Sequence, residues 1–273
     1  MKRTCHVLIL GRGKVGVALQ RAAKRAGHRV QIASSRHWNA STPIHAELLV
    51  LAVRDKDIEP LAEALSASGS VGRKTVVVHV AGSRSSAVLR SLRAVSAGVA
   101  QMHPMIAFAT PSFSPTLAGG HAHVEGDPAA VALARRFCRS LGLVPRTFPG
   151  LNPVGYHAAA GLVANGAAAL AALGQELLVR SGARAQDVPH ILGPLLRSVA
   201  ENVEALGMPG ALTGPVRRGD AAGLARHLST IRELLPEAAS FYAEAARAQL
   251  PLARTLADAP VESFDAIEAL LRS

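Results

Sequence analysis

The chain has 273 residues, 49% of them hydrophobic, which suits one large domain or two of ordinary size with a substantial buried core. Its net charge of +11 is uneven, because residues 1–150 carry +13 and residues 151–273 carry −2. A basic half suits a small polyanionic ligand, whereas scattered basic residues and an aromatic content of 3% argue against nucleic acid as a partner.

Cysteine usage and hydropathy indicate a cytoplasmic protein. Cys5 and Cys138 cannot build a disulfide framework, and neither has a CxxC partner, which favours a reducing compartment. The first residues, MKRT, lead directly into a strand-like run without a signal-peptide pattern. The most apolar stretch, residues 158–174, is too short and too rich in Ala and Gly to span a bilayer, and it contains Asn165. We therefore expect no membrane partner.

The first expected strand, residues 6–10, runs into three glycines spaced G-x-G-x-x-G and then into an amphipathic helix near 14–26. In a dinucleotide-binding turn, Gly11 would permit the tight bend, Gly13 the approach of the pyrophosphate, and Gly16 the packing of helix on strand. The helix N-terminus would offer free N–H groups to phosphates. The alternative is a turn without a ligand.

The second expected strand, residues 29–34, ends without the carboxylate that binds the adenosine ribose of NAD. Ser34, Ser35 and Arg36 stand there instead, and no Asp or Glu occurs before Glu47. Hydroxyls and a guanidinium suit a 2′-phosphate, and Arg12 would add a second cation. The sequence therefore predicts NADP(H), unless Arg36 is only a solvated loop residue.

Alternating apolar runs and helical patterns continue to residue 149. Strands are expected at 47–53, 75–82, 98–104, 121–126 and 144–149, helices near 57–67, 85–95 and 128–141, and a loop at 111–120. This alternation predicts a parallel sheet covered by helices on both faces. The first domain is therefore an α/β Rossmann dinucleotide-binding domain, residues 1–150.

Only helical patterns follow. A long helix is expected over 152–181, with Asn152 as a candidate cap, Pro153 in the first turn and Gly182 as the stop. Further helices are expected near 187–206, 220–235, 237–249 and 260–271. Residues 151–273 therefore form an all-helical second domain, expected to bind substrate and to dimerise.

Five motifs carry a resemblance to a known family: VLAVRDKDI (50–58), VVVHVAGS (76–83), HPMIAFA (103–109), GYHAAAGLVANG (155–166) and ALTGPVRRGD (211–220). They resemble the Rossmann-like proteins whose helical half is called domain of unknown function 2520. The resemblance implies an NADP-dependent oxidoreductase, similar in architecture to pyrroline-5-carboxylate reductase and to the 6-phosphogluconate and 3-hydroxyacid dehydrogenases.

The resemblance also suggests catalytic residues. The hydroxyacid dehydrogenases carry a catalytic Lys four residues before an Asn, and Asn165 matches that Asn while Gly161 stands at the Lys position. His157 lies one turn earlier on the same helical face and is our candidate acid or base, unless it is a structural histidine at the domain junction. Tyr156 points elsewhere around the helix, so we expect it to pack.

Two further histidines, His79 and His103, come near the carboxyl ends of expected strands, where parallel sheets bind ligands. We expect each to contact nicotinamide or substrate, with a structural role as the alternative. His103 joins His157 and Asn165 in the candidate catalytic set. The expected cofactor-binding residues are Gly11, Arg12, Gly13, Val15, Gly16, Ser34, Ser35, Arg36, Ala52, Val53 and His79.

The loop at residues 211–220 is the expected substrate-binding element. Thr213 offers a hydroxyl, and Arg217 or Arg218 a guanidinium, for an anionic substrate group. Asp220 most simply caps the following helix and secondarily orients an Arg. Because residues 152–181 are rich in Ala and Gly, and related folds bury this helix between subunits, we expect a homodimer.

The leading hypothesis is an NADPH-dependent reductase of a small, anionic C=O or C=N substrate. The second is a non-catalytic NADP(H)-binding sensor or assembly protein, which the missing Lys favours. A different hydride carrier, such as a deazaflavin, in the same cleft is a third possibility.

Overall fold

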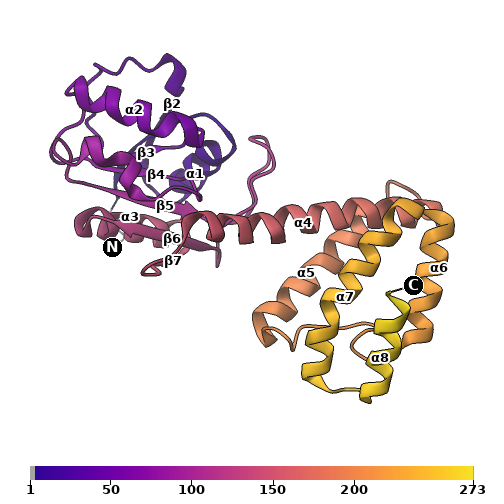
Figure 1. The fold of residues 1–273 in the computed structure, drawn as a ribbon. Coiled ribbons are helices and arrows are strands. Elements are labelled where there is room, and N and C mark those ends of the chain that lie inside the picture. Colours follow the sequence, from indigo (N-terminus) through magenta and orange to yellow (C-terminus); the bar gives the residue numbers. More distant parts are fainter. Residues whose placement is uncertain (1–3, 273) are drawn as a thin grey trace. The chain divides into compact units, whose positions relative to one another are not determined.

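The computed structural model describes residues 4–272 (Figure 1). The chain divides into two compact units between Ala164 and Asn165, inside the long helix α4 (Pro153–Arg180). The last strand, β7 (Val144–Arg146), ends close to residue 150, where the sequence pattern changes. The first unit nevertheless continues into the first three turns of α4, so Tyr156 and His157 belong to it.

A seven-stranded sheet, in the order β2-β1-β3-β4-β5-β6-β7, forms the centre of the first unit. The strands before β7 are β1 (His6–Leu10), β2 (Arg29–Ala33), β3 (Leu48–Leu51), β4 (Val76–His79), β5 (Gly98–Pro104) and β6 (His121–Gly126). The strand order reverses between β1 and β3, and open α/β sheets bind ligands outside the carboxyl ends of the strands at such a point.

One strand direction corrects the sequence-based expectation of a parallel sheet. β6 runs antiparallel to β5, with His103 opposite His123, whereas the other neighbouring strands are parallel. Parallel strands need a crossover connection, usually a helix. Residues 105–120 form no helix and bring the chain back at the carboxyl end of β5, so β6 must run in the opposite direction.

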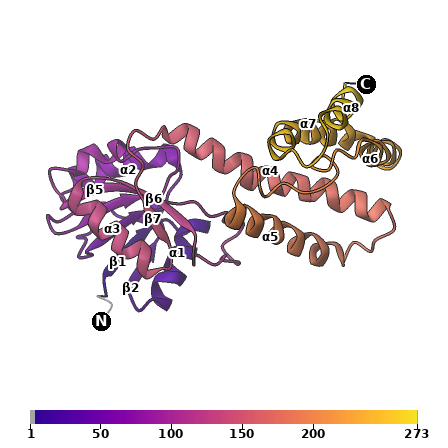
Figure 2. The same cartoon turned by 90° about the horizontal axis from the view of Figure 1, so that it is seen from below.

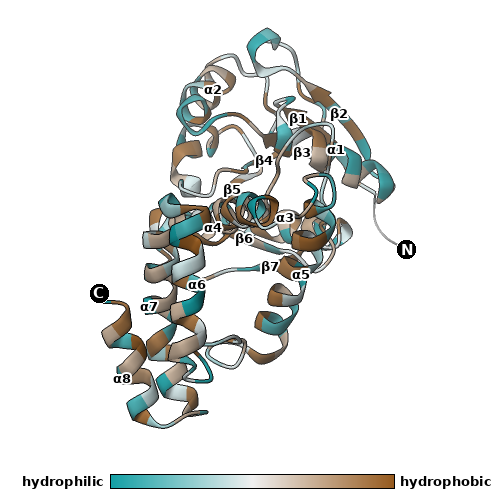
Figure 3. Cartoon of the chain, turned by 90° about the vertical axis from the view of Figure 1, so that its right-hand side faces the viewer, coloured by the Kyte–Doolittle hydropathy of each residue, from teal (hydrophilic) through white to brown (hydrophobic). Residues whose placement is uncertain are grey.

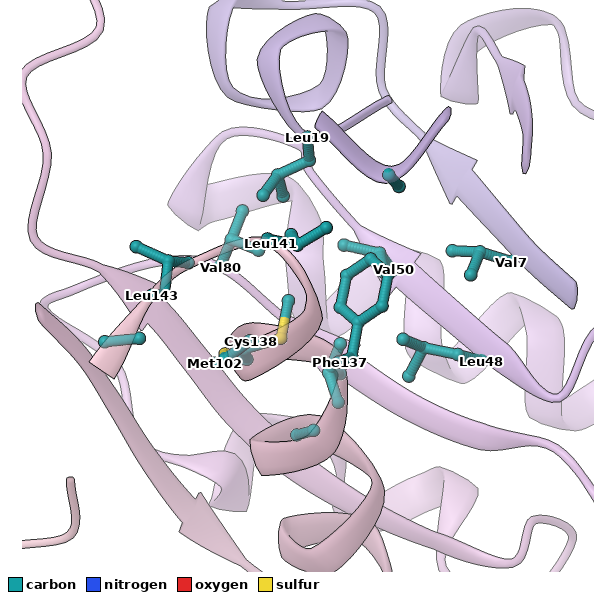
Figure 4. Close-up of a cluster of buried hydrophobic side chains, with 14 of the residues drawn as sticks. Val7, Leu19, Leu48, Val50, Val80, Met102, Phe137, Cys138, Leu141 and Leu143 are labelled. Atoms are coloured by element: carbon teal, nitrogen blue, oxygen red, sulfur yellow. The ribbon is translucent and has the colours of Figure 1, made fainter. Parts of the chain in front are cut away.

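Helices cover both faces of the sheet. Alternate strand residues such as Val7 and Val50 pack against α1 (Lys14–Arg25) and α3 (Pro128–Ser140), where Figure 4 shows Leu19 and Phe137 beside them. The residues between them, such as Leu8, pack against α2 (Asp55–Ala67) and η2 (Ser86–Leu92). The expected helix near 85–95 is thus a short 3₁₀ helix.

The second unit is helical throughout its described residues. After the end of α4 it contains α5 (Val188–Leu206), α6 (Ala221–Leu234), η3 (Pro236–Ala238), α7 (Ala239–Leu256) and α8 (Val261–Leu270). Figure 2 shows α6, α7 and α8 gathered together. Leu228, Leu250 and Phe264 are members of their common core.

Helices α4 and α5 are poorly covered by the rest of the chain. No residue of α4 is buried, and α4 is long and apolar enough to meet a length-and-composition test for a membrane span, a test that core and interface helices also meet. Figure 3 shows brown, hydrophobic segments along α5. Six of its large apolar side chains are 40–64% exposed: Ile191, Leu195, Leu196, Val199, Val203 and Leu206. Apolar surface of this extent marks an interaction face.

Candidate functional site

The three fingerprint glycines occupy a tightly packed turn between β1 and α1. A Cβ on Gly11, whose φ is 128°, would lie 2.1 Å from the carbonyl oxygen of Ala52. A Cβ on Gly16 would lie 2.0 Å from the carbonyl oxygen of Gly11, so only glycine fits at either position. Gly13 has open space around it. The turn thus packs strand and helix closely and leaves room beside Gly13.

The N-terminus of α1 suits an anion. Gly13 is the N-cap, so no side chain covers the first N–H groups, and the first turn contains no acidic residue. Val15 packs against the core and holds this end of the helix on the sheet. Arg12 is exposed and makes no hydrogen bond or ion pair within residues 4–272. Free N–H groups, the helix dipole and a free guanidinium together fit a pyrophosphate.

The segment after β2 carries the proposed 2′-phosphate ligands. Ser34 precedes a short 3₁₀ helix, η1 (Ser35–His37), that contains Ser35 and Arg36. Neither serine hydroxyl nor the Arg36 guanidinium has a hydrogen-bond partner among the described residues. Glu47, the first acid in the chain, binds the backbone N–H of His6 at the other end of β1. The residues present fit NADP(H) better than NAD.

The ends of β3 and β4 have different roles. Ala52 and Val53 are half-buried, and the Ala52 carbonyl contacts the glycine turn. His79, by contrast, is completely buried: its Nδ1 accepts the Ala81 N–H at 3.2 Å, so its Nε2–H donates to the Ser85 carbonyl at 3.1 Å. Burial also lowers the pKa of His79. Both ring nitrogens are thus engaged within the chain, and His79 takes the structural alternative by shaping the turn after β4.

Two imidazoles converge above Gly82, in the turn after β4. A Cβ on Gly82 would lie 2.4 Å from Nδ1 of His157 and 2.7 Å from Nε2 of His103, which brings the two nitrogens within about 5 Å of each other. The ring centroids are 5.7 Å apart, and the planes meet at 77°. His103 comes from β5 and His157 from α4. One ligand oxygen or nitrogen atom placed between them can therefore contact both.

His103 belongs to a group of aromatic side chains on one face of β5 and β6. We call His103, His121, His123, Phe148 and Tyr156 the histidine face. His123 stacks on Phe148 with an interplanar angle of 3°, and the Tyr156 ring lies 5.5 Å from both His103 and His123. Burial, with the nearby His157 and His123, lowers the pKa of His103 to about 4. Burial also lowers the pKa values of His121 and His123.

A cavity of about 560 Å³ adjoins the histidine face. Gly82, Gln101, His123, Glu125, Phe148 and Tyr156 are among its lining residues. The Gln101 side chain donates to the Ala81 carbonyl at 2.7 Å and thereby supports the turn that carries Gly82. Small-molecule sites are commonly concave and combine apolar walls with placed polar groups. The lining of this cavity contains both, with Phe148 and Tyr156 beside Gln101, His123 and Glu125.

Gly82, His121 and His123 are not among the site residues expected from the sequence, and Tyr156 was expected only to pack. A signal was present in HAH at 121–123, because residues two apart on a strand share a face. The antiparallel register then aligns this pair with His103. Among the described residues, no group of three or more His, Cys, Asp or Glu side chains can hold a metal ion.

The remaining candidates lie in the second unit. Asn165 and Thr213 are exposed. Arg217 binds Asp258 at 2.6 Å and the carbonyls of Gly210 and Leu212, so it braces its own loop and is not free for an anion. Arg218 is exposed and makes no hydrogen bond or ion pair in the part of the chain that the structure describes. Asp220 accepts the Gly223 N–H at 2.7 Å and caps α6, as the sequence predicts.

The histidine face predicts loss of stability in mild acid. A histidine whose pKa is lower in the folded than in the unfolded chain binds fewer protons when folded, so its contribution is present above pH 6.5 and lost as the pH falls. For His103, with a folded pKa of about 4, the loss between pH 6.5 and 4 approaches about 3 kcal/mol. The fluorescence of Trp38, in the first unit, can follow urea unfolding across this range.

Two variants separate this effect from the titration of carboxylates. His103→Asn should flatten the pH dependence of the unfolding free energy, whereas His190→Asn, at an exposed position of α5, should leave it unchanged. Equal slopes in wild type and His103→Asn would refute the assignment.

Comparisons with known proteins agree with this architecture. The model of a Rossmann-like domain matches residues 38–104, and that of the domain of unknown function DUF2520 matches residues 121–249. No curated protein matches the chain.

Three solved structures share the fold. A candidate NADP oxidoreductase from Bacteroides fragilis has a TM-score of 0.69 at 18% identity, covering 90% of this chain and 98% of its own. A pyrroline-5-carboxylate reductase from Coxiella burnetii has a TM-score of 0.60 at 17% identity, and the match covers 90% of this chain and 99% of the reductase. An imine reductase from Myxococcus stipitatus, in complex with NADP+, has a TM-score of 0.55 at 14% identity, and the match covers 89% of this chain and 94% of the reductase. The chain thus joins a Rossmann-like domain to a C-terminal DUF2520 domain.

Proposed function

We propose that this protein is an NADP(H)-dependent oxidoreductase that acts on the C=N or C=O bond of a small, anionic substrate. The observation that carries the proposal is the convergence of His103 Nε2 and His157 Nδ1 above Gly82, at the carboxyl edge of the sheet that carries the glycine turn. Dinucleotide folds bind their cofactor at this edge. The two solved relatives named as reductases support a C=N substrate in particular.

A bound nicotinamide supplies the hydride, so the protein has to orient the substrate and manage one proton. His157 is exposed and has no hydrogen-bond partner among residues 4–272, so it can exchange a proton with solvent and donate it to the substrate heteroatom. His103 stays neutral, because its pKa is about 4, and it contacts the same heteroatom through Nε2. Arg218, Thr213 and Asn165 are exposed in the second unit, and their role as contacts for an anionic group stays a prediction.

The alternative is a protein that binds NADP(H) without catalysis. Gly161 stands where the hydroxyacid dehydrogenases of the sequence resemblance have their catalytic Lys, so no amine is available there, which favours this alternative. A panel of small cyclic imines and keto acids, assayed by the absorbance of NADPH, tests the difference. Turnover that disappears in His157→Ala while NADPH affinity stays within a few-fold supports an enzyme. Tight NADPH binding without turnover on the whole panel supports the sensor.

The free guanidinium at the end of β2 predicts cofactor preference. Arg36→Ala should weaken NADPH binding by roughly 1–3 kcal/mol, because it removes a charge-assisted contact to the 2′-phosphate, and should leave NADH binding unchanged. Arg29→Ala is the matched control, since Arg29 is also exposed but lies at the start of β2, at the opposite end of the strand from Arg36. Titration calorimetry with both cofactors measures the effect. Equal wild-type affinities for NADPH and NADH would contradict the proposal.

The close contacts of Gly82 predict a second effect. In Gly82→Ala the new methyl group would overlap His157 Nδ1 and His103 Nε2, so the rings must separate and turnover should fall strongly. Gly72→Ala is the control, because a Cβ there has open space. The assay is turnover with the best substrate of the panel, beside thermal unfolding to check the fold. Unchanged turnover in Gly82→Ala would remove the convergence point from the mechanism.

We also propose that the second unit forms a homodimer, which would cover the exposed apolar side chains of α5. Leu195→Glu should convert the dimer to a monomer, because burying a carboxylate in an apolar interface is costly. Arg197→Glu, two residues on and on another face of the helix, is the control. Light scattering over a concentration series measures the mass. A wild-type mass near 28 kDa at high concentration would refute the dimer.

A further inference from the structure

The chain contains two tyrosines, and each places its hydroxyl on Nδ1 of a histidine. Tyr156 is 3.3 Å from His103 Nδ1, and Tyr242 is 2.8 Å from His227 Nδ1. The first pair lies on the histidine face and the second in the helical unit, between α6 and α7. Tyr156 therefore does more than pack, because its hydroxyl reaches the far nitrogen of a ring whose Nε2 points to Gly82.

The direction of this hydrogen bond follows from proton affinities. Burial raises the pKa of Tyr156 to about 12, so the phenol keeps its proton. His103 is neutral, and a neutral imidazole has one N–H and one nitrogen lone pair. A phenol O–H is a good donor and the imidazole lone pair a strong acceptor, so Tyr156 donates to Nδ1. The single imidazole proton must then reside on Nε2.

We propose that Tyr156 is a positioning residue that holds His103 in the tautomer protonated at Nε2, so that an N–H donor faces the point above Gly82. The tautomer itself is inferred from the Tyr156–His103 hydrogen bond and the proton affinities of its two partners, while its use in catalysis rests on the proposed oxidoreductase function. With Nε2 protonated, His103 donates a hydrogen bond to a lone pair of a substrate oxygen, or to the lone pair that hydride transfer creates on a protonated substrate nitrogen, and keeps its own proton throughout. An unprotonated Nε2 would repel that lone pair.

The tautomer gives the two converging imidazole rings different roles. His103 is buried and hydrogen-bonded at Nδ1, so it is a fixed, neutral donor. His157 is exposed on the same helix as Tyr156 and supplies the mobile proton. A hydrogen bond that orients the reacting bond and a separate proton donor are the two functions that a hydride transfer to C=N or C=O needs from the protein.

Nitrogen-15 NMR of the histidine rings tests the tautomer without a substrate. In the wild type, the His103 signals, assigned by their loss in His103→Asn, should show a protonated Nε2 and an unprotonated Nδ1 at neutral pH. In Tyr156→Phe, the population protonated at Nδ1 should rise. Tyr242→Phe is the matched control and should change only the His227 signals.

The second readout is turnover. Tyr156→Phe should lower kcat roughly tenfold with little change in KM or in NADPH affinity, as expected for one lost orienting hydrogen bond. Tyr242→Phe should leave turnover unchanged.

The outcomes separate the two levels of the inference. A wild-type His103 protonated at Nδ1, or a tautomer unaffected by Tyr156→Phe, overturns the positioning role, and the wild-type spectrum decides even if the variant does not fold. A tautomer shift in a protein without turnover upholds the positioning role and refutes the proposed function instead. A tautomer shift with unchanged kcat refutes the catalytic use of the N–H.

Discussion

The contact between Gly11 and the Ala52 carbonyl is the constraint on which the first unit depends. A Cβ on Gly11 would lie 2.1 Å from the carbonyl oxygen of Ala52, so only a glycine lets the chain turn after β1 so close to the end of β3. Gly16 then lets α1 pack onto the same turn. This packing aims the uncovered N-terminus of α1 at the edge of the sheet where the strand order reverses. The phosphate site and the free side chains after β2 follow from this one close approach.

Much of the fold could be predicted from the sequence, because apolar periodicity specifies strands and helices locally. β5 and β6 have the expected bounds, and α4 differs by one residue at each end. The direction of β6 was missed, although the loop expected at 111–120 left no crossover helix between β5 and β6. The 3₁₀ geometry of η2 was missed for a different reason, because helical spacing does not distinguish the two helix types over two turns.

The candidate site shows the same limit. The glycine turn and the Asp220 cap could be predicted, because a strand, spaced glycines and a helix start follow one another in the local sequence. The histidine face depends on the reversed direction of β6. His121 and His123 lie on one face of that strand, and only the antiparallel register brings them beside His103. Arg217 looked free for a substrate because the carboxylate that binds it, Asp258, lies forty-one residues away in sequence. Tertiary partners of this kind leave no local signal.

Crowding at Gly82 has a consequence for evolution. The position tolerates no side chain while both imidazoles occupy their places, so a larger residue there must follow the loss or displacement of one ring. His103 comes from strand β5 and His157 from helix α4, so one ring cannot take over the position of the other. Positions 82, 103 and 157 should therefore covary among relatives of this chain, with lineages that replace the glycine also replacing a histidine.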